Sequence, residues 1–351
     1  MSSLKDLLGR MIRADGPMPL STFMTLCLHH KEHGYYASRP GLGKDFITAP
    51  ETSQIFGDLI GLWLAHTWQA IGAPDRFNLV ELGAGRATLM QDALRASKAM
   101  QEFQAAFDLT LIDASPHLEA IQADRLQAYQ PAQLRSLDEL GDGAALIVAN
   151  EYLDCLPARQ FLKQNEIWQE RVIGLNAAGE LELGLSVDRA PQTPDGIAEA
   201  QTIVEFQPGL ESFIEQLRAR AEQGSPVCAL LFDYGPNDVA PGDTFRAYSN
   251  GQQIDPLLCP GESDLTVDVD FGRLKRIAEK AGLIVHGPVQ QGEFLLRLGA
   301  EAYLNRLITN APDKAQLIYD GARRLIDPAD MGAKFKAICI SNQTQFTPAG
   351  F

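Results

Sequence analysis

The sequence predicts a doubly wound α/β fold with an N-terminal helical region and an inserted α+β element. From about residue 78 onward, short apolar runs alternate with helical segments, as in repeated βαβ units. Two of the runs, residues 144–149 and 227–232, are apolar throughout, which is typical of parallel strands covered on both faces. The first run, residues 78–82, leads into a Gly-x-Gly turn and then a helix. These observations together favour an open, seven-stranded sheet.

Residues 1 to about 75 are predicted to be mostly helical. Apolar residues at positions 4, 7, 8 and 11 lie on one helix face, and a second helix is expected from residue 21 to about residue 30. Thr48-Ala49-Pro50-Glu51 has the pattern of a capping box with proline in the first turn, which would open a third helix. We expect Gly57 and Gly61 on that helix to permit close packing against another helix.

The remaining elements follow the alternation of strands and helices. Strands are predicted at residues 78–82, 108–113, 134–137, 144–149, 227–232, 283–286 and 335–340, the last of them antiparallel. Helices are predicted from Thr88, from Pro116, over residues 271–281 and from residue 294 to about 325. Between the fourth and fifth strands lies an insertion of about residues 157–207. Its alternating segments at 167–172 and 181–185 predict an antiparallel β element.

Composition excludes several classes of protein. The chain has 351 residues and a formal net charge of -15, which argues against binding to nucleic acid or to anionic lipid. Its five cysteines are scattered and lack Cys-x-x-Cys spacing, which suits a reducing compartment. No apolar run is long enough to cross a bilayer, and the N-terminus resembles neither a signal peptide nor a mitochondrial presequence. We therefore expect a cytoplasmic bacterial protein without membrane insertion.

The turn after the first strand carries the clearest functional signal. Glu81 ends the strand, and Gly83 and Gly85 flank Ala84 in the turn, where glycines let the backbone approach a nucleotide. A dinucleotide site would need a third glycine at the position of Thr88. The carboxylate of Glu81 would repel phosphate but suit a cation. The pattern therefore favours S-adenosylmethionine, a phosphate-free nucleoside with a sulfonium and an ammonium group, over a turn needed only for packing.

Acidic residues also follow the next two strands. Asp113, with its neighbour Ala114, follows the second strand, where a carboxylate can accept hydrogen bonds from both ribose hydroxyls. Asp113 or Ser115 would equally serve as the N-cap of the helix that starts at Pro116. Leu137 and Asp138 follow the third strand, where such folds contact the adenine.

The fourth strand ends in a polar segment that predicts a methyl-acceptor site. Asn150, Glu151 and Asp154 would lie beside the methyl donor, because ligands of open α/β sheets bind beyond the carboxyl ends of the strands. Carboxylates bind a guanidinium bidentately and fix its plane, so Glu151 and Asp154 suit an arginine acceptor. The alternative is that Asn150 caps a helix and the acids favour its N-terminus.

Other polar segments give weaker signals. Asp233-Tyr234-Gly235-Pro236 ends the fifth strand on the same edge of the sheet. This segment would either line the substrate side of the site or form only the turn that follows the strand. His29, His30, Glu32 and His33 do not match the spacing of any standard metal site, so no metal is expected.

The motifs together resemble the MidA-like S-adenosylmethionine-dependent methyltransferases, which include a mitochondrial complex I assembly factor that methylates an arginine. The resemblance runs nearly end to end and rests on these segments: 33–36 (HGYY), 45–51 (DFITAPE), 53–57 (SQIFG), 81–86 (ELGAGR), 150–154 (NEYLD), 233–235 (DYG), 287–288 (GP) and 291–292 (QG). It implies a class I methyltransferase fold in which residues 76–351 bind the cofactor and residues 1–75 supply a helical region with an active-site loop. Thr48 and Glu51 would close the cofactor site.

This chain departs from the family pattern at the cofactor turn and at one loop. Family members usually carry Gly-Pro-Gly-Arg-Gly there, whereas this chain has Ala84 and Ala87 in place of the proline and the last glycine. Alanine permits a helical backbone, so we expect cofactor binding to survive. Lys44 stands before Asp45 where the family usually has Gly-Gly, which leaves the substrate-side loop less defined.

The predicted function is S-adenosylmethionine-dependent dimethylation of an arginine on a protein substrate, which the resemblance implies to be a respiratory complex I core subunit. Two alternatives share the fold: an enzyme with a small-molecule acceptor, and a non-catalytic assembly factor that retains the cofactor pocket. A dinucleotide oxidoreductase is disfavoured because the Glu81 carboxylate would repel the pyrophosphate of a dinucleotide and because the third glycine is absent.

Overall fold

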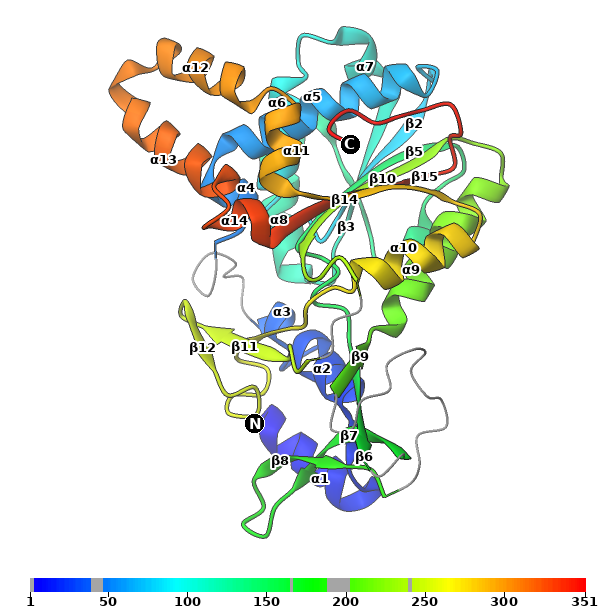
Figure 1. Ribbon diagram of the computed structural model, residues 1–351, viewed down its shortest axis with the longest axis vertical. Helices are drawn as coiled ribbons and strands as arrows, with labels where there is room; N and C mark the ends of the chain where they lie inside the picture. The colour runs from blue at the N-terminus through cyan, green and yellow to red at the C-terminus, as the bar shows by residue number, and fades with distance from the viewer. Residues whose placement is uncertain (1–2, 39–46, 165–166, 188–202, 239–241) are drawn as a thin grey trace. The chain divides into compact units, whose positions relative to one another are not determined.

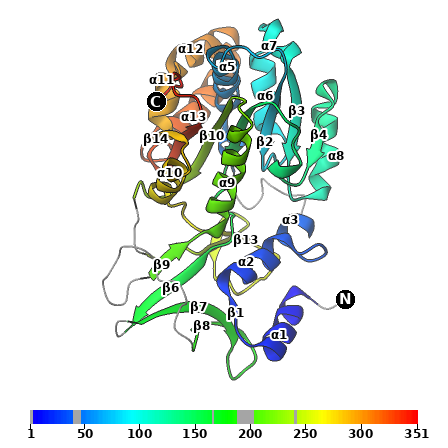
Figure 2. The same ribbon diagram turned by 90° about the vertical axis from the view of Figure 1, so that its right-hand side faces the viewer.

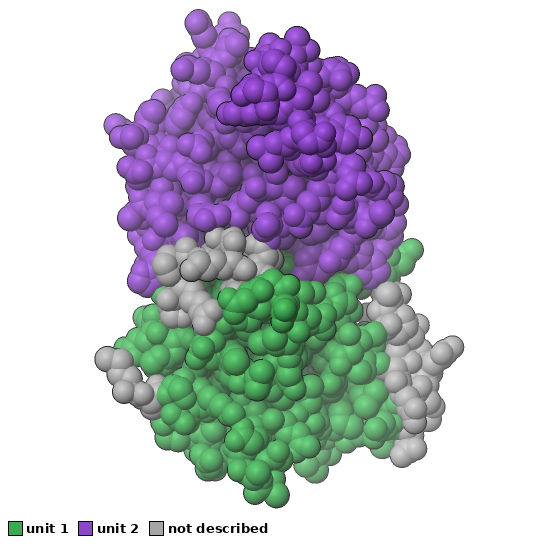
Figure 3. Space-filling model, turned by 90° about the vertical axis from the view of Figure 1, so that its left-hand side faces the viewer, with its two compact units in different colours: residues 1–46, 153–212, 238–270 green, residues 47–152, 213–237, 271–351 purple. Residues whose placement is uncertain are grey.

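The computed structural model describes residues 3–38, 47–164, 167–187, 203–238 and 242–351. The chain forms two compact units, and each unit is assembled from separate segments (Figure 3). Unit 1 comprises residues 1–46, 153–212 and 238–270, and unit 2 comprises residues 47–152, 213–237 and 271–351. The predicted division at residue 75 falls inside unit 2, and the predicted insertion at 157–207 falls inside unit 1.

Unit 2 contains the predicted seven-stranded sheet, in the order β14-β15-β10-β5-β2-β3-β4 (Figure 1). The strands are β2 (Phe77–Leu82), β3 (Phe107–Ile112), β4 (Ala132–Leu134), β5 (Ala144–Asn150), β10 (Val227–Tyr234), β14 (Ile284–Gln290) and β15 (Phe335–Ser341). The five strands from β10 to β4 run parallel, and β15 is antiparallel to both β10 and β14. The doubly wound fold and its antiparallel last strand are therefore confirmed.

Helices cover both faces of this sheet (Figure 2). Alternate strand residues such as Leu79 and Leu146 join one buried cluster with α5 (Gln54–Ala70) and α6 (Thr88–Ala96). Helices α9 (Pro208–Glu222) and α10 (Phe271–Lys280) lie toward the opposite face in the same view. The other α-helices of unit 2 are α4 (Ala49–Thr52), α7 (Gln101–Ala106), α8 (Pro116–Arg125), α11 (Gln291–Arg297), α12 (Ala300–Asn310), α13 (Ala315–Ile326) and α14 (Met331–Lys334).

The predicted role of two glycines in helix packing is confirmed. A Cβ atom added at Gly57 would lie 2.5 Å from the Cβ of Asp92, and one added at Gly61 would lie 2.1 Å from the carbonyl oxygen of Ala93. Since both distances are far below van der Waals contact, α5 and α6 approach as closely as they do only because these positions lack side chains.

Three predicted element boundaries were wrong. The helix expected from Thr48 is broken, because α4 (Ala49–Thr52) ends at the extended residue Ser53, whose Oγ caps the separate helix α5. The third strand covers residues 132–134 instead of 134–137, and Leu137 begins a short 3-10 helix (Leu137–Glu139). The helical stretch expected over 294–325 is divided at Gly299, which has a φ of 88°, and again near Pro312.

Unit 1 combines helices with two antiparallel sheets. Helices α1 (Leu4–Asp15) and α2 (Leu20–His29) share a buried cluster that includes Leu8 and Phe23, and α3 (Tyr35–Ser38) follows. One sheet joins β1 (Met18–Pro19), β7 (Ile167–Leu175), β6 (Arg159–Gln164) and β9 (Ile203–Phe206), with β8 (Leu181–Leu185) on β7. The other joins β12 (Gln252–Ile254), β11 (Arg246–Ser249) and β13 (Asp264–Thr266). The antiparallel element predicted at 167–185 is confirmed. Among the described residues, no helix has the length and apolar content needed to span a membrane.

Candidate cofactor and methyl-acceptor site

The turn after β2 is left-handed at three positions. Gly83 has a φ of 63°, Gly85 of 53° and Ala87 of 58°, all in the region that favours glycine. The Gly83 amide donates to the carbonyl of Ile112 at 2.8 Å, which holds the start of the turn against β3. A Cβ atom at Gly83 would lie 3.1 Å from the Tyr152 ring. Both the backbone conformation and the space available therefore require glycine at position 83.

The backbone conformation of Ala87 differs from the one expected from the sequence. We expected alanine to be tolerated because it permits a helical backbone, but Ala87 is the residue before α6 and has φ 58° and ψ 30°. This left-handed conformation costs an L-amino acid about 1–2 kcal/mol. The substitution of the family's usual glycine is therefore a source of strain, although the chain still forms the turn.

Glu81 lies at the buried carboxyl end of β2. Its side chain is 3% exposed, and its Oε2 atom has no hydrogen-bond partner among the described residues. Burial, and secondarily the nearby carboxylate of Asp113, raises the pKa of Glu81 well above its ordinary value. A cation placed beside this carboxylate would offset both effects.

Asp113 follows β3 and is bound to the glycine turn. Its Oδ2 accepts hydrogen bonds from the Gly85 amide at 3.0 Å and from Gln122 Nε2 at 3.1 Å, and its Oδ1 accepts one from the Ser115 amide at 2.8 Å. Burial raises the pKa of this carboxyl group, although the donors partly offset that rise. Ser115 precedes α8 but its side chain makes no capping hydrogen bond. The sequence did not single out Gln122, because no local pattern marks a contact between a helix and loops distant in the chain.

Asn150 ends β5 and Glu151 follows it directly, and no helix begins there. Residues 151–158 form bends and turns, so the alternative in which Asn150 is a helix N-cap is excluded. Glu151 has a φ of 53°, a strained conformation for a residue with a side chain. Its Oε1 accepts hydrogen bonds from Asn150 Nδ2 at 2.9 Å and from the Ala49 amide at 3.4 Å.

The predicted residue Thr48 precedes α4, and the predicted residue Glu51 lies within that helix. The Glu51 carboxylate forms an ion pair with Arg86, whose Nε lies 2.8 Å from Glu51 Oε1, and it does not return to cap Thr48. Arg86 comes directly after Gly85. Segment 48–51 is therefore attached to the cofactor turn through Arg86 and to Glu151 through the Ala49 amide.

The other predicted site residues lie in varied surroundings. Leu137 is buried, whereas Asp138 is exposed and accepts a hydrogen bond from Gln216 at 2.8 Å. Ala114 lies directly after Asp113, between β3 and α8. Asp154 belongs to unit 1 and is buried there, whereas Asn150 and Glu151 belong to unit 2. Asp233 at the end of β10 is fully buried.

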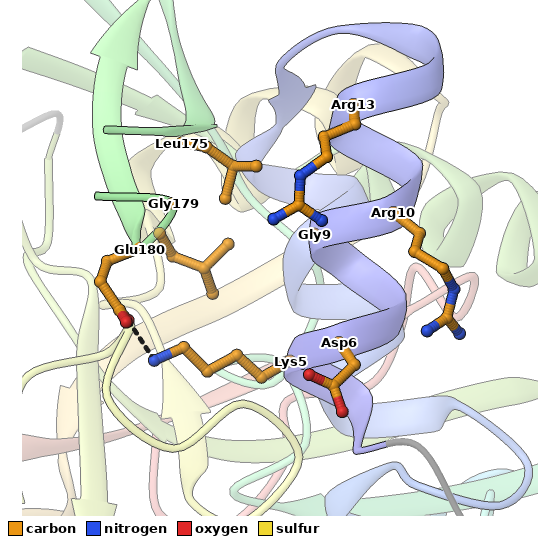
Figure 4. Close-up of a pocket in the computed structure, with 9 residues that line it drawn as sticks. Lys5, Asp6, Gly9, Arg10, Arg13, Leu175, Gly179 and Glu180 are labelled. Carbon is orange, nitrogen blue, oxygen red and sulfur yellow. Dashed lines mark hydrogen bonds and ion pairs between the residues drawn. The ribbon is translucent and has the colours of Figure 1, made fainter. Parts of the chain in front are cut away.

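A pocket of about 450 Å³ in unit 1 is separate from these predicted residues. It lies between α1 and the β7–β8 hairpin, and its lining includes Lys5, Arg13 and Glu180 (Figure 4). Lys5 forms an ion pair with Glu180 there. In the described part of the chain, no group of three or more metal-ligating side chains is found, the histidines of residues 29–33 included.

Buried acceptor atoms gather on the elements around the cofactor turn. Glu81 Oε2, Gln122 Oε1 and Asn150 Oδ1 are buried and have no hydrogen-bond partner among the described residues. Glu81 and Asn150 lie on the adjacent strands β2 and β5, and Gln122 bonds to the turn itself. Unpaired acceptors next to a buried carboxylate fit a ligand that brings donors and positive charge. The ammonium and sulfonium groups of S-adenosylmethionine meet that requirement, whereas a phosphate does not.

Comparisons with known proteins agree with this chemistry. Residues 59–289 match a family model described as "Putative S-adenosyl-L-methionine-dependent methyltransferase". The chain is 35% identical to protein arginine methyltransferase NDUFAF7 homolog of Drosophila melanogaster, over 96% of this chain and 84% of that protein. It is 33% identical to protein arginine methyltransferase NDUFAF7 of Homo sapiens, over 94% of this chain and 81% of that protein.

A solved structure supports both the fold and the cofactor. The crystal structure of a COG1565 superfamily member from Burkholderia thailandensis, bound to S-adenosyl-homocysteine, superposes with a TM-score of 0.85. It is 25% identical and covers 99% of this chain and 93% of that one. The cofactor of this chain is therefore S-adenosyl-L-methionine.

The same comparisons correct the expected location. The relatives from Drosophila melanogaster, Caenorhabditis elegans and Homo sapiens are all named as mitochondrial proteins, so the prediction of a cytoplasmic bacterial protein is wrong. On the match over residues 59–289 and the identity to curated relatives along nearly the whole chain, this protein belongs to the S-adenosyl-L-methionine-dependent methyltransferase family.

Proposed function

We propose that this methyltransferase dimethylates an arginine of a respiratory complex I subunit and so supports assembly of that complex. Curated relatives are named protein arginine methyltransferases, which supports a guanidinium acceptor on a protein. The complex I target comes from the family resemblance of the motifs. The negative net charge of the chain, -15, also suits a basic peptide substrate.

The observation that carries the proposal is the geometry of Glu151. A carboxylate at the end of β5 is held in a left-handed backbone, and its Oε1 is fixed by two donors of the protein, Asn150 Nδ2 and the Ala49 amide. Strain of this kind is retained where a side chain must point in one direction. A fixed carboxylate binds a guanidinium in one plane and so aligns one nitrogen for attack, and alignment is most of what methyl transfer requires.

The remaining roles follow from position. S-adenosylmethionine supplies the methyl group on a sulfonium. In the proposed assignment, Glu81, Gly83, Ala84 and Gly85 hold its methionine part, Asp113 and Ala114 its ribose, and Leu137 and Asp138 its adenine, while Thr48 and Glu51 close the site. Asn150 orients Glu151, which binds the guanidinium. Transfer would form an N–C bond, break the C–S bond of the sulfonium and leave S-adenosylhomocysteine. Because an arginine side chain stays protonated in water, the guanidinium would also lose a proton, which the Glu151 carboxylate is placed to accept.

The decisive experiment compares cells with and without the protein by mass spectrometry of methylated arginine, with complex I subunits examined first. We expect dimethylation of one arginine to disappear in the deletion and to return with the wild-type chain. Glu151→Gln should not restore it, whereas the matched control Glu293→Gln, in an exposed ion pair on α11, should. Unchanged methyl-arginine in the deletion, with methylation of another molecule lost, would contradict the arginine assignment and favour a small-molecule acceptor.

A further inference from the structure

Gln122 on α8 is a buried residue that joins the two parts of the cofactor site. Its side chain is 0% exposed. Nε2 donates to the Gly85 carbonyl at 2.8 Å and to Asp113 Oδ2 at 3.1 Å. Because both partners are acceptors, the amide can have only this orientation, and Oε1 must point away from them. One side chain therefore connects the glycine turn after β2 with the carboxylate after β3.

The hydrogen bonds of Asp113 limit what its carboxylate can still accept. A carboxylate has about four acceptor positions, two on each oxygen. Oδ2 already receives Gln122 Nε2 and the Gly85 amide, while Oδ1 receives the Ser115 amide. Among the described contacts, the open position is thus on Oδ1, so the carboxylate is arranged to accept one further donor and not two.

We propose that Gln122 is a positioning residue of the cofactor site, which holds Asp113 so that its Oδ1 accepts a hydrogen bond from a single ribose hydroxyl of the cofactor. The proposal deepens the cofactor assignment and rests on it. A carboxylate held in place before the ligand binds pays less entropy on binding, which is how a residue without ligand contact raises affinity. It also revises the sequence-based expectation that Asp113 accepts hydrogen bonds from both hydroxyls.

Calorimetric titration with S-adenosylhomocysteine and with its 2′-deoxy and 3′-deoxy analogues tests this proposal on the full chain. For the wild-type protein, one analogue should bind about tenfold more weakly than S-adenosylhomocysteine and the other nearly as well, as expected for one hydrogen bond to a charged acceptor. For Gln122→Met, affinity for S-adenosylhomocysteine should fall about tenfold, and the difference between the two analogues should largely disappear.

Gln291→Met is a closely matched control. Gln291 on α11 is also 0% exposed, its Nε2 also donates to a carbonyl, that of Leu325 at 3.0 Å, and its Oε1 likewise lacks a partner among the described residues. It makes no contact with the turn in the described hydrogen bonds. This variant should lose stability as Gln122→Met does, but it should retain the wild-type affinities and the wild-type ratio between analogues.

The outcomes separate this proposal from the cofactor assignment. If Gln122→Met binds S-adenosylhomocysteine with the wild-type ratio between analogues, Gln122 has no positioning role and the proposal fails while the cofactor stands. If the wild-type protein loses affinity equally for both analogues, Asp113 accepts hydrogen bonds from both hydroxyls. That result would also overturn the proposal. Absence of any binding by the folded wild-type chain would contradict the cofactor itself. If Gln122→Met fails to fold, the affinities of the wild-type protein for the two analogues still show whether Asp113 binds one ribose hydroxyl or both.

Discussion

Single residues in and before the cofactor turn are not the ones that would make the ligand-free protein most stable. Gly83 and Gly85 occupy left-handed positions without cost, whereas Ala87 adopts the same kind of conformation with a side chain. Glu81 places a carboxylate in a buried position where it lacks a full set of partners. Both residues lower the stability of the ligand-free protein, and the two can be tested separately.

Replacement of Ala87 by glycine should stabilise the protein. Glycine relieves the left-handed strain but adds entropy to the unfolded chain, so we expect a net gain of about 1 kcal/mol in the free energy of unfolding, measured by denaturant titration. Ala84→Gly is the control in the same turn, because Ala84 does not have a positive φ. That variant should gain nothing. A loss of stability in Ala87→Gly would mean that packing of the buried Ala87 methyl outweighs the strain.

Glu81 should make stability depend on pH. Its pKa in the folded state is raised well above the usual value of about 4.5, so the folded protein binds more protons than the unfolded chain between these two values. The contribution of Glu81 to the free energy of unfolding is therefore fully present below about pH 4.5. It is lost as the pH rises toward and through the pKa of Glu81 in the folded protein.

The variant Glu81→Gln should remove this contribution. At pH 7 it should be more stable than the wild type by about 1–3 kcal/mol, because the amide avoids the cost that the raised pKa of Glu81 imposes on the folded protein above pH 4.5, yet bind S-adenosylhomocysteine about tenfold more weakly. Thermal unfolding over pH 4–8 and calorimetry measure the two effects. Glu102→Gln, an exposed carboxyl group on α7, should change neither. Stability of Glu81→Gln equal to the wild type at every pH would show that Glu81 is not strained in the ligand-free protein.

At the scale of elements, buried and long segments were predictable and short polar ones were not. Residues 144–149 of β5 and 227–232 of β10 are apolar throughout because both faces of the sheet are covered, and the sequence shows this directly. The break between α4 and α5 was missed, because the extended backbone of Ser53, whose Oγ caps α5, lies inside a stretch that resembles one continuous helix. The strands β6, β9 and β11–β13 are only three to six residues long, and their burial does not alternate regularly, so they give no periodic signal in the sequence.

The crossing of α5 and α6 should not tolerate a side chain. Gly61→Ala would place its methyl group 2.1 Å from the Ala93 carbonyl oxygen, so the helices must separate. We expect a loss of about 3 kcal/mol or more in the free energy of unfolding by denaturant titration. Gly141→Ala is the matched control, since an added Cβ there meets nothing within 4 Å. Similar stability of the two variants would show that this helix contact is easily displaced.

At the scale of the whole molecule, the fold class followed from the alternation of elements, but the division into units did not. Unit 1 collects residues from the N-terminus, from the segment after β5 and from residues 238–270, and no composition change marks these boundaries. The acceptor residues predicted together, Glu151 and Asp154, accordingly fall in different units. Contacts between segments distant in the chain decide such a division, and a single sequence does not display them.

Ligand binding should stabilise the whole chain in a selective manner. S-adenosylhomocysteine at 100 times its dissociation constant should raise the free energy of unfolding by about 2.7 kcal/mol, seen as a rise in the melting temperature that grows with the logarithm of ligand concentration. NAD at the same concentration should produce no rise, because its pyrophosphate meets the carboxylate of Glu81. An equal rise with NAD would contradict the argument from Glu81.

The interleaving of the two units also bears on how the chain is made. Neither unit is continuous, and β14 joins the sheet of unit 2 through β15, which ends at Ser341. A ribosome delivers residues in order, so the sheet of unit 2 cannot be completed until nearly all 351 residues have been synthesised. Until then, the apolar strands β5 and β10 must stay shielded by other means. We therefore expect the nascent chain to depend on chaperones for most of its synthesis, and truncation before β15 to yield an aggregating product instead of a smaller folded one.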